Sequence, residues 1–303
     1  MLCRYPLVLG HTLPVPCGQC MSCRINKRRE WASRILLESF GHKENAFVTL
    51  TYDDDHLPPD LSLNPKHLQD WLKRLRKQVL PHRLRFFGVG EYGDKTFRPH
   101  YHLILFGFPS CTYGRPRISS NSSCPCMPCR LISRTWRFGF SYLGSVTSES
   151  ANYTASYTLK KMTQKDDSRL NGRHPEFARM SNRPGIGTSF VDQIASGLDK
   201  IDLDIHFNGD LPPALKMANK SLPLGKYLKR KIRESLGRDA RTPQHIIDDY
   251  VNDAVEWLND YLSNNEVTRK DKHSIAYRER FKFQVDRKEN LHKIYQSRKG
   301  GSL

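Results

Sequence analysis

The apolar run at residues 101–106 constrains the fold more than any other part of the sequence. It follows a short turn and a second run of aromatic and branched residues at 84–90, and together these segments predict a β-hairpin. Successive side chains of a strand point to opposite faces, so His100 and His102 project to one side and Tyr101 to the other. The sequence therefore predicts an antiparallel sheet that carries a pair of imidazoles on one face.

The neighbouring segments indicate an α+β chain. Residues 46–51 are rich in branched and aromatic side chains and predict a strand, and residues 137–147 predict another. Asn64 and Pro65 are the residue types of a helix cap and of a first helical position, and apolar residues then recur at helical spacing as far as Val79. Helices are thus expected to pack on the sheet.

Other regions carry different signals. Ser22 is expected to cap a helix with a basic outer face near the start of the chain. Residues 165–200 show no clear period and are expected to form a long connection. From Pro212 onward the sequence becomes helical and charged, with basic clusters at 226–233 and 282–299.

A carboxylate is needed if the histidine pair is to hold a hard divalent cation. Mg2+ and Mn2+ prefer oxygen ligands, and Glu91 is well placed because it ends the strand that pairs with the histidine strand. Asp94, in the turn, is the alternative. We therefore expect Glu91, His100 and His102 to hold Mg2+ or Mn2+, although an incidental histidine pair beside a turn carboxylate would read the same way in sequence.

A second motif places two phenols on one predicted helix. Residues four apart on a helix lie about 40° from each other around its axis, so Tyr153, Tyr157 and Lys161 form one stripe, with Lys160 beside it. A tyrosine can attack a phosphodiester to give a covalent phosphotyrosine, and a nearby lysine favours the phenolate. The helix is expected to be capped by Thr147 or Ser148. Amphipathic packing would produce the same tyrosine spacing.

The charge of the chain indicates a polyanionic partner. Its 303 residues include 49 Lys and Arg against 31 Asp and Glu, a formal net charge of +18. Such a chain is attracted to nucleic acid. No run of about 20 apolar residues is available to cross a bilayer, and the first ten residues do not resemble a secretory signal, so we expect a soluble, intracellular protein without a membrane partner.

Eight cysteines fall into two groups, and a chain of this length without an export signal favours reduced thiols or metal ligation over disulfides. The first group has the two-residue gaps typical of zinc sites, with Cys3 as the expected fourth ligand. The second lies in a segment rich in Ser and Pro, and free surface thiols are the competing interpretation. The groups are Cys3, Cys17, Cys20 and Cys23, and Cys111, Cys124, Cys126 and Cys129.

These motifs together resemble the HUH endonuclease superfamily, and within it the replication initiation proteins of gokushovirus-like microviruses, which are small single-stranded DNA bacteriophages. The resemblance spans about residues 14–162. The residues that carry it are Pro16-Cys-Gly-Gln-Cys-Met-Ser-Cys-Arg24, Phe47-Val-Thr-Leu-Thr-Tyr52, Gly90-Glu-Tyr-Gly93, Arg98-Pro-His-Tyr-His102 and the pair Tyr153 and Tyr157. Two features depart from the family pattern, namely the bulky Tyr101 between the histidines and the cysteine-rich insertion.

The resemblance implies a five-stranded antiparallel sheet flanked by helices and a divalent ion held by the histidines. It implies that the tyrosines nick single-stranded DNA at a replication origin, stay attached to the 5′ phosphate, leave a 3′ hydroxyl that primes rolling-circle synthesis, and later rejoin the strand. The host bacterial cytoplasm is the expected location, with host helicase and polymerase as further partners.

The expected domain organisation is an HUH-type nicking and joining domain at residues 1–200, with the cysteine-rich insertion at about 109–130, and a helical basic region at residues 201–303. Two other functions stay open. One is a non-catalytic zinc-containing nucleic-acid-binding protein, which the cysteines and the charge favour. The other is an HUH relaxase or transposase of a plasmid or mobile element, which would share the same chemistry.

Overall fold

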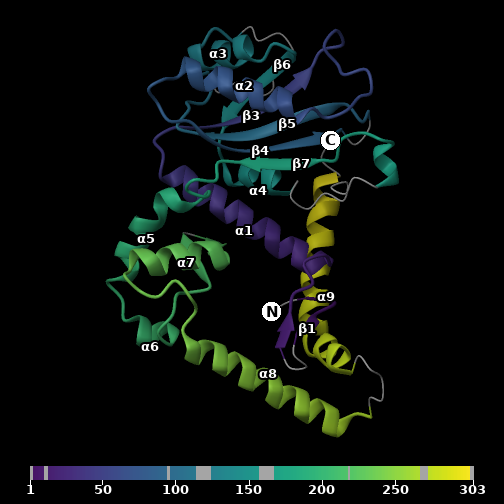
Figure 1. Cartoon of the computed structure of the whole chain (residues 1–303), viewed down its shortest axis with the longest axis vertical. Helices are drawn as coiled ribbons and strands as arrows, with labels where there is room; N and C mark the ends of the chain where they lie inside the picture. Colours follow the sequence, from purple (N-terminus) through teal and green to yellow (C-terminus); the bar gives the residue numbers. More distant parts are fainter. Residues whose placement is uncertain are drawn as a thin grey trace. The chain divides into compact units, whose positions relative to one another are not determined.

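The computed structural model describes residues 3–9, 13–93, 96–113, 124–156, 167–217, 219–266 and 272–300 (Figure 1). The chain forms two compact units, each assembled from separate stretches of sequence. The first unit comprises Met1–Lys27, Asp199–Pro212 and Gly237–Leu303, and the second unit comprises Arg28–Leu198 and Pro213–Leu236. The domain boundary expected at residue 200 stays a prediction.

The second unit is built around a five-stranded sheet with strand order β6-β3-β5-β4-β7. Every neighbouring pair in it is antiparallel, so the predicted α+β architecture is confirmed. The central strands β4 and β5 are buried along almost their whole length, because helices cover both faces of the sheet. The strands are β3 (Asn45–Tyr52), β4 (Arg85–Tyr92), β5 (Pro99–Phe106), β6 (Gly139–Ser145) and β7 (Phe177–Met180).

Helices α2 (Pro65–Gln78) and α3 (Met127–Thr135) cover one face of this sheet (Figure 1). The side chain of Asn64 accepts hydrogen bonds from the first turn of α2, which confirms the predicted cap. Trp71 of α2 is fully buried, and its Nε1 donates to Oγ1 of Thr135 in α3 at 3.1 Å. The core beneath these helices includes alternate residues of the strands, among them Val48, Leu50, Tyr101, Leu103 and Leu105.

The opposite face carries α4 (Ser148–Ser156) and the part of α1 (Met21–Phe40) that belongs to the second unit (Figure 1). Trp31 of α1 contacts Phe87 of β4, with ring centroids 5.3 Å apart. The Oγ1 of Thr147 accepts from the backbone N–H of Ser150, and the Oγ of Ser150 accepts from the N–H of Thr147. Reciprocal bonds of this kind start a helix at a defined residue.

The segment after residue 166 is more structured than its sequence indicates. Instead of one long connection at 165–200, the described residues form β7, two short 3-10 helices, η2 (Ser168–Leu170) and η3 (Thr188–Phe190), and α5 (Val191–Leu198). β7 is a four-residue edge strand with the sequence Phe-Ala-Arg-Met, which is too short to show an alternating pattern. Sheet pairing with β4, rather than local sequence, therefore defines this strand.

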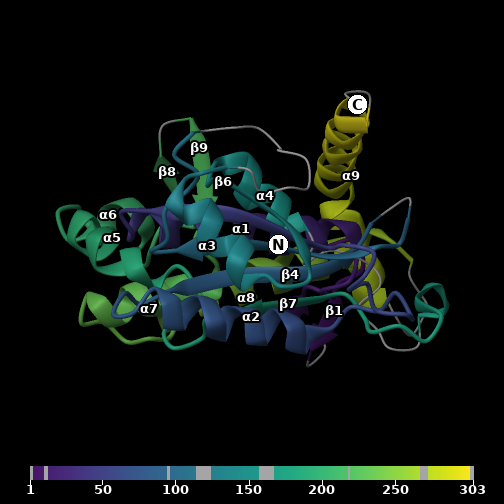
Figure 2. The same cartoon turned by 90° about the horizontal axis from the view of Figure 1, so that it is seen from above.

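A small hairpin and one helix complete the second unit. β8 (Ala214–Met217) and β9 (Lys220–Pro223) form an antiparallel pair, and α7 (Gly225–Ser235) follows. Figure 2 shows this hairpin beside α4, where the Nζ of Lys220 donates to the hydroxyl of Ser148.

The first unit contains β1 (Leu7–Leu9), β2 (Leu13–Val15), α6 (Leu203–Phe207), α8 (Gln244–Asn264) and α9 (Lys272–Gly300). The helical character predicted for the C-terminal region is confirmed. Ser22 lies inside α1 instead of capping it, and its hydroxyl donates to Oε1 of Glu289 in α9 at 3.0 Å. Within the described ranges, we find no helix with the length and apolar character that a membrane crossing requires.

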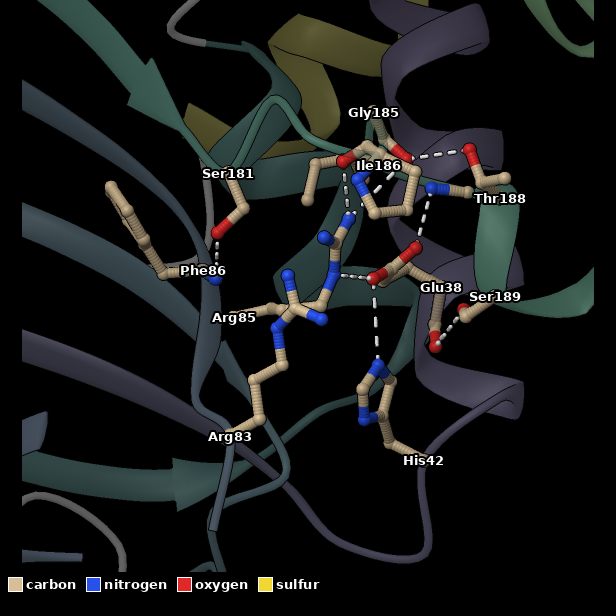
Figure 3. A network of polar contacts seen from close by, with 12 residues as sticks. Glu38, His42, Arg83, Arg85, Phe86, Ser181, Gly185, Ile186, Thr188 and Ser189 are labelled. Atoms are coloured by element: carbon tan, nitrogen blue, oxygen red, sulfur yellow. Dashed lines mark hydrogen bonds and ion pairs between the residues drawn. The ribbon is translucent and has the colours of Figure 1, made fainter. Parts of the chain in front are cut away.

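A buried carboxylate links α1 to the sheet (Figure 3). The side chain of Glu38 is inaccessible to solvent, and its Oε1 accepts from Nε of Arg85 in β4 at 2.5 Å. Its Oε2 accepts from the N–H of Gly187 at 2.7 Å, and the Arg85 guanidinium donates to the carbonyl of Pro184 at 2.9 Å. One charge pair therefore holds α1, β4 and the 184–187 segment together.

The network lowers the pKa of Glu38. Burial alone would raise this pKa, but hydrogen bonds from His42 and Arg85 outweigh it and bring the pKa from 4.5 to about 2. Because the folded pKa lies below the unfolded one, the carboxylate stabilises the fold fully above pH 4.5. That contribution is lost as the pH falls toward the folded value.

We predict that Glu38→Gln lowers the free energy of unfolding at pH 7 by about 3–5 kcal/mol, because the Arg85 charge is left buried without its partner. At pH 3 the gap from the wild type should shrink by about 2 kcal/mol, since the wild type has by then lost part of the linked stability. Urea denaturation at both pH values measures the two gaps.

The matched control is Glu44→Gln, which removes an exposed carboxylate and should leave the unfolding free energy within about 0.5 kcal/mol of the wild type. An equal gap at pH 3 and pH 7 for Glu38→Gln would contradict the titration argument.

Candidate metal and tyrosine site

The register of the β4–β5 pair brings three predicted site residues together. Glu91 lies directly opposite His100, and Val89 lies opposite His102. On the other side of β5, Thr49 of β3 pairs with His102. The two imidazoles therefore share one face with a carboxylate from β4 and a hydroxyl from β3.

One carboxylate oxygen of Glu91 meets both imidazoles. Oε1 lies 2.7 Å from Nε2 of His100 and 2.9 Å from Nε2 of His102. Side-chain exposure is 3% for Glu91, 7% for His102 and 18% for His100, so the group opens to solvent on the His100 side. The expected ligand trio is thus assembled in one place.

Contacts at the far side of each ring fix its orientation. Nδ1 of His100 donates to the carbonyl of Arg98 at 3.1 Å, because a carbonyl can only accept. Nδ1 of His102 lies 2.9 Å from Oγ1 of Thr49, and Phe47 stacks on the His102 ring at a centroid distance of 5.8 Å. With both Nδ1 atoms engaged, both Nε2 atoms are directed at Glu91, which is the arrangement that outer-shell partners give to metal-binding histidines.

The Glu91 carboxylate is held in its charged form. Burial alone would raise the pKa of Glu91, but hydrogen bonds with His100 and His102 outweigh that cost and hold the pKa well below its ordinary value. A buried negative charge flanked by two imidazoles favours a cation at their centre. The N···O spacings also fit, since neighbouring ligands of an octahedral ion with bonds near 2.1 Å lie about 3 Å apart.

Tyr153 of α4 lies beside this trio. Its hydroxyl is 3.4 Å from Nε2 of His102, and the two rings are 5.1 Å apart at their centroids. Phe47 contacts the Tyr153 ring edge-on at 6.2 Å. The side chain is 40% exposed, so the phenol borders the trio and is also open to solvent.

The structure does not cover every predicted site residue. Tyr157, Lys160 and Lys161 lie outside the described residues, as does Asp94, the alternative carboxylate. The roles predicted for them stay predictions.

Tyr101, the unusual residue between the histidines, has a place on the opposite face of the sheet. It is fully buried, its hydroxyl donates to the carbonyl of Asn64 at 3.0 Å, and it accepts from the N–H of Asn64 at 3.0 Å. The hydroxyl of Tyr52 lies 2.7 Å away. Burial raises the pKa of Tyr101 to about 12. This tyrosine therefore joins β5 to the start of α2 and stays uncharged.

Both predicted cysteine groups are assembled. In each group the four Sγ atoms all lie within 4.8 Å of one another. The sulfurs of Cys3 and Cys20 are 3.8 Å apart, and those of Cys111 and Cys124 are 3.6 Å apart. All eight cysteines are free thiols.

Comparison with known proteins places this arrangement in context. Residues 45–162, which contain β3, β5 and α4, match the family model of the replication-associated protein ORF2. A segment of 184 residues, 58% of this chain, is 38% identical to replication-associated protein ORF2 of Spiroplasma virus 4. The similarity to microvirus replication proteins is confirmed.

Two other relatives show the same similarity. Replication-associated protein VP4 of Bdellovibrio phage phiMH2K is 34% identical over 59% of this chain, and replication-associated protein ORF4 of Chlamydia phage 1 is 32% identical over 52% of it. The matched segments span 56%, 58% and 41% of the Spiroplasma, Bdellovibrio and Chlamydia phage proteins. No solved structure matches the chain.

Sequence reasoning missed the residues that orient the histidines in this microvirus-type segment. Thr49 and Phe47 alternate along β3 on the same face as the histidines, and the Arg98 carbonyl precedes the histidine pair. The available signal was the pattern of β3, in which these two positions interrupt the Val48 and Leu50 core positions. Recognising it required the β3–β5 register, which the sequence does not state.

We predict that Tyr101→Phe lowers the free energy of unfolding by about 1–3 kcal/mol, because buried polar groups at Asn64 and Tyr52 lose their partner. Guanidinium denaturation measures the change, with the exposed Tyr5→Phe as a control that should be near neutral. Imidazole NMR shifts of His100 and His102 should stay in place, since Tyr101 faces away from them. An unchanged unfolding free energy would contradict the role assigned to this hydroxyl.

Proposed function

We propose that this protein initiates rolling-circle replication of a microvirus by nicking and rejoining single-stranded DNA at a replication origin. The observation that carries the proposal is the Tyr153 hydroxyl, which lies 3.4 Å from an imidazole of the Glu91, His100 and His102 trio. A nucleophile and a cation site are needed side by side for metal-assisted phosphodiester cleavage. The similarity to replication-associated proteins supports the same function.

Glu91, His100 and His102 would hold the divalent ion, Mg2+ or Mn2+. Such an ion polarises the non-bridging oxygens of the scissile phosphate. The Arg98 carbonyl and the Thr49 hydroxyl keep both Nε2 atoms pointed at the site before DNA arrives, so little reorganisation is needed at that moment.

Tyr153 would supply the nucleophile. Its phenol loses a proton to water, its oxygen forms a bond to phosphorus, and the bond from phosphorus to the 3′ oxygen breaks. The leaving 3′ oxygen takes up a proton and becomes the hydroxyl that primes synthesis, while the 5′ phosphate stays on the tyrosine. Rejoining reverses these steps with a 3′ hydroxyl as the nucleophile, and Tyr157 is the proposed second tyrosine for a successive transfer.

Charge around α4 supports a DNA substrate. Lys220 of β9, which contacts Ser148 at the start of α4, lies beside the tyrosine helix, and the chain as a whole carries +18. Lysines near a bound strand neutralise phosphates and release counterions. We place the reaction in the host bacterial cytoplasm, where host helicase and polymerase would extend the primer.

A second candidate function is a non-catalytic zinc-containing nucleic-acid-binding protein. The observation that favours it is the pair of four-cysteine groups. The two functions differ in one product, because only the nicking enzyme forms a covalent bond to DNA. A relaxase or transposase would form the same bond and differ in the DNA it accepts.

We predict that Tyr153→Phe lowers the rate of first-strand nicking at least about 1000-fold, because the variant lacks the attacking oxygen. The assay uses a single-stranded origin library with Mn2+, and mass spectrometry of the adduct should map the DNA to the peptide containing Tyr153. Tyr157→Phe should retain nicking and lose the successive transfer. The control Tyr5→Phe should behave as the wild type.

Retention of nicking and of the covalent adduct in the double variant Tyr153→Phe/Tyr157→Phe would rule out the mechanism. Absence of any adduct in the wild type with Mn2+ would favour the zinc-protein alternative.

We predict that Thr49→Val weakens Mn2+ binding about 10–100-fold, because His102 loses the contact that orients its ring. Titration calorimetry of Mn2+ measures the affinity, and nicking should recover at high Mn2+ concentration. Thr51→Val is the matched control, since Thr51 lies on the same face of β3 but, in the described residues, its side chain makes no hydrogen bond to His100. Equal Mn2+ affinity in both variants would contradict the positioning role of Thr49.

A further inference from the structure

The cysteine group in the first unit has the geometry of a metal site. Cys3, Cys17, Cys20 and Cys23 have all their sulfurs within 4.8 Å of one another, and the Cys3 and Cys20 sulfurs are 3.8 Å apart. A tetrahedral zinc ion with Zn–S bonds near 2.3 Å sets its sulfurs about 3.8 Å apart. The protein thus presents four sulfurs at the spacing that one zinc ion requires.

Disulfides do not account for this arrangement. A disulfide brings two sulfurs to about 2.05 Å and leaves them paired. Here the four thiols are free and gather around one centre, so the spacing favours a shared ion over two bridges.

Backbone N–H groups point at the sulfurs. The N–H of Cys17 donates to Sγ of Cys3 at 3.3 Å, the N–H of Cys20 donates to Sγ of Cys17 at 3.3 Å, and the N–H of Arg4 donates to Sγ of Cys20 at 3.4 Å. Such donors stabilise thiolates, which are the form that binds a metal. The loop is folded around the sulfurs as a preformed metal-binding turn.

The surroundings indicate what an ion would do. The buried apolar cluster between α8 and α9 in the first unit is small, with Ala254, Leu258, Ala276 and Tyr277 as its buried members. The residues next to the cysteines reach α9 through polar bonds, since Arg4 pairs with Asp286 at 2.7 Å. A unit with so little apolar core gains much of its stability from a metal.

We propose that Cys3, Cys17, Cys20 and Cys23 bind one structural Zn2+ ion that stabilises the first unit. Four thiolates fill a tetrahedral shell and leave no position for substrate, which distinguishes this site from the Glu91, His100 and His102 trio. Thiolates select zinc over Mg2+ and Mn2+. The inference does not depend on the proposed nicking activity.

The second cysteine group supports a separate Zn2+ site on its own distances. Sγ of Cys124 lies 3.6 Å from Sγ of Cys111 and 3.4 Å from Sγ of Cys126, and the Cys126 and Cys111 sulfurs are 4.0 Å apart. Cys126 immediately precedes α3 and Cys129 lies in its first turn. An ion there would fasten the start of α3 to Cys111, which follows β5, and we infer a second structural zinc at this position.

The test uses the full chain purified under reducing conditions without added metal. Elemental analysis should find one zinc per chain for each group, and titration with an organomercurial in the presence of a zinc indicator should release both ions as the thiolates react. Cys20→Ser should lose the zinc of the first group only, and Cys126→Ser the zinc of the second only, so each variant is the matched control for the other.

Hydrogen exchange on the wild type separates the structural role from simple binding, and it does not depend on whether a variant folds. Removing zinc should speed amide exchange in residues 13–27 and in α9 at least about 10-fold while β3, β4 and β5 keep their protection. Iron in place of zinc, a zinc-free reduced protein, disulfides found by alkylation, or unchanged exchange in the first unit after zinc removal would each overturn the proposal for that group.

Discussion

The antiparallel register between β4 and β5 is the constraint on which the candidate site depends. Because Glu91 lies opposite His100, a carboxylate and two imidazoles meet without any loop having to position them. A shift of one residue would turn Glu91 to the Trp71 side of the sheet and leave the histidines without an acidic partner. Tyr52 and Tyr101, bonded to each other in that core, hold the same sheet to α2 and so protect the register from the opposite side.

Much of this arrangement could be predicted from the sequence. The short turn between residues 90 and 99 limits how the two strands can pair, so the meeting of Glu91 with His100 follows from local chain length and alternation. Asn64 and Thr147 carry their own capping chemistry, and both helices begin where those residues indicate. Local patterns therefore defined the strands, the caps and the trio.

Features set by distant partners were not predictable in this way. Glu38 and Arg85 are 47 positions apart, and neither belongs to a motif, so only the folded chain shows that they pair. β7 is recognisable by its bonds to β4 rather than by its four residues. Thr49 reads as an ordinary strand threonine until β3 is set beside β5. In each case tertiary pairing decides the role, and a single sequence carries no direct record of it.

The tyrosine helix and the histidine strand are held with very different strength. The residues that α4 buries are Ala151, Thr154 and Ala155, all small, whereas β5 is enclosed almost completely. At about 0.8 kcal/mol for each buried methyl group, α4 is docked by only a few kcal/mol, which is comparable to what a handful of phosphate contacts provides. An incoming strand could therefore realign the phenol while the imidazoles stay fixed, so one rigid anchor would serve both the opening and the resealing of the DNA.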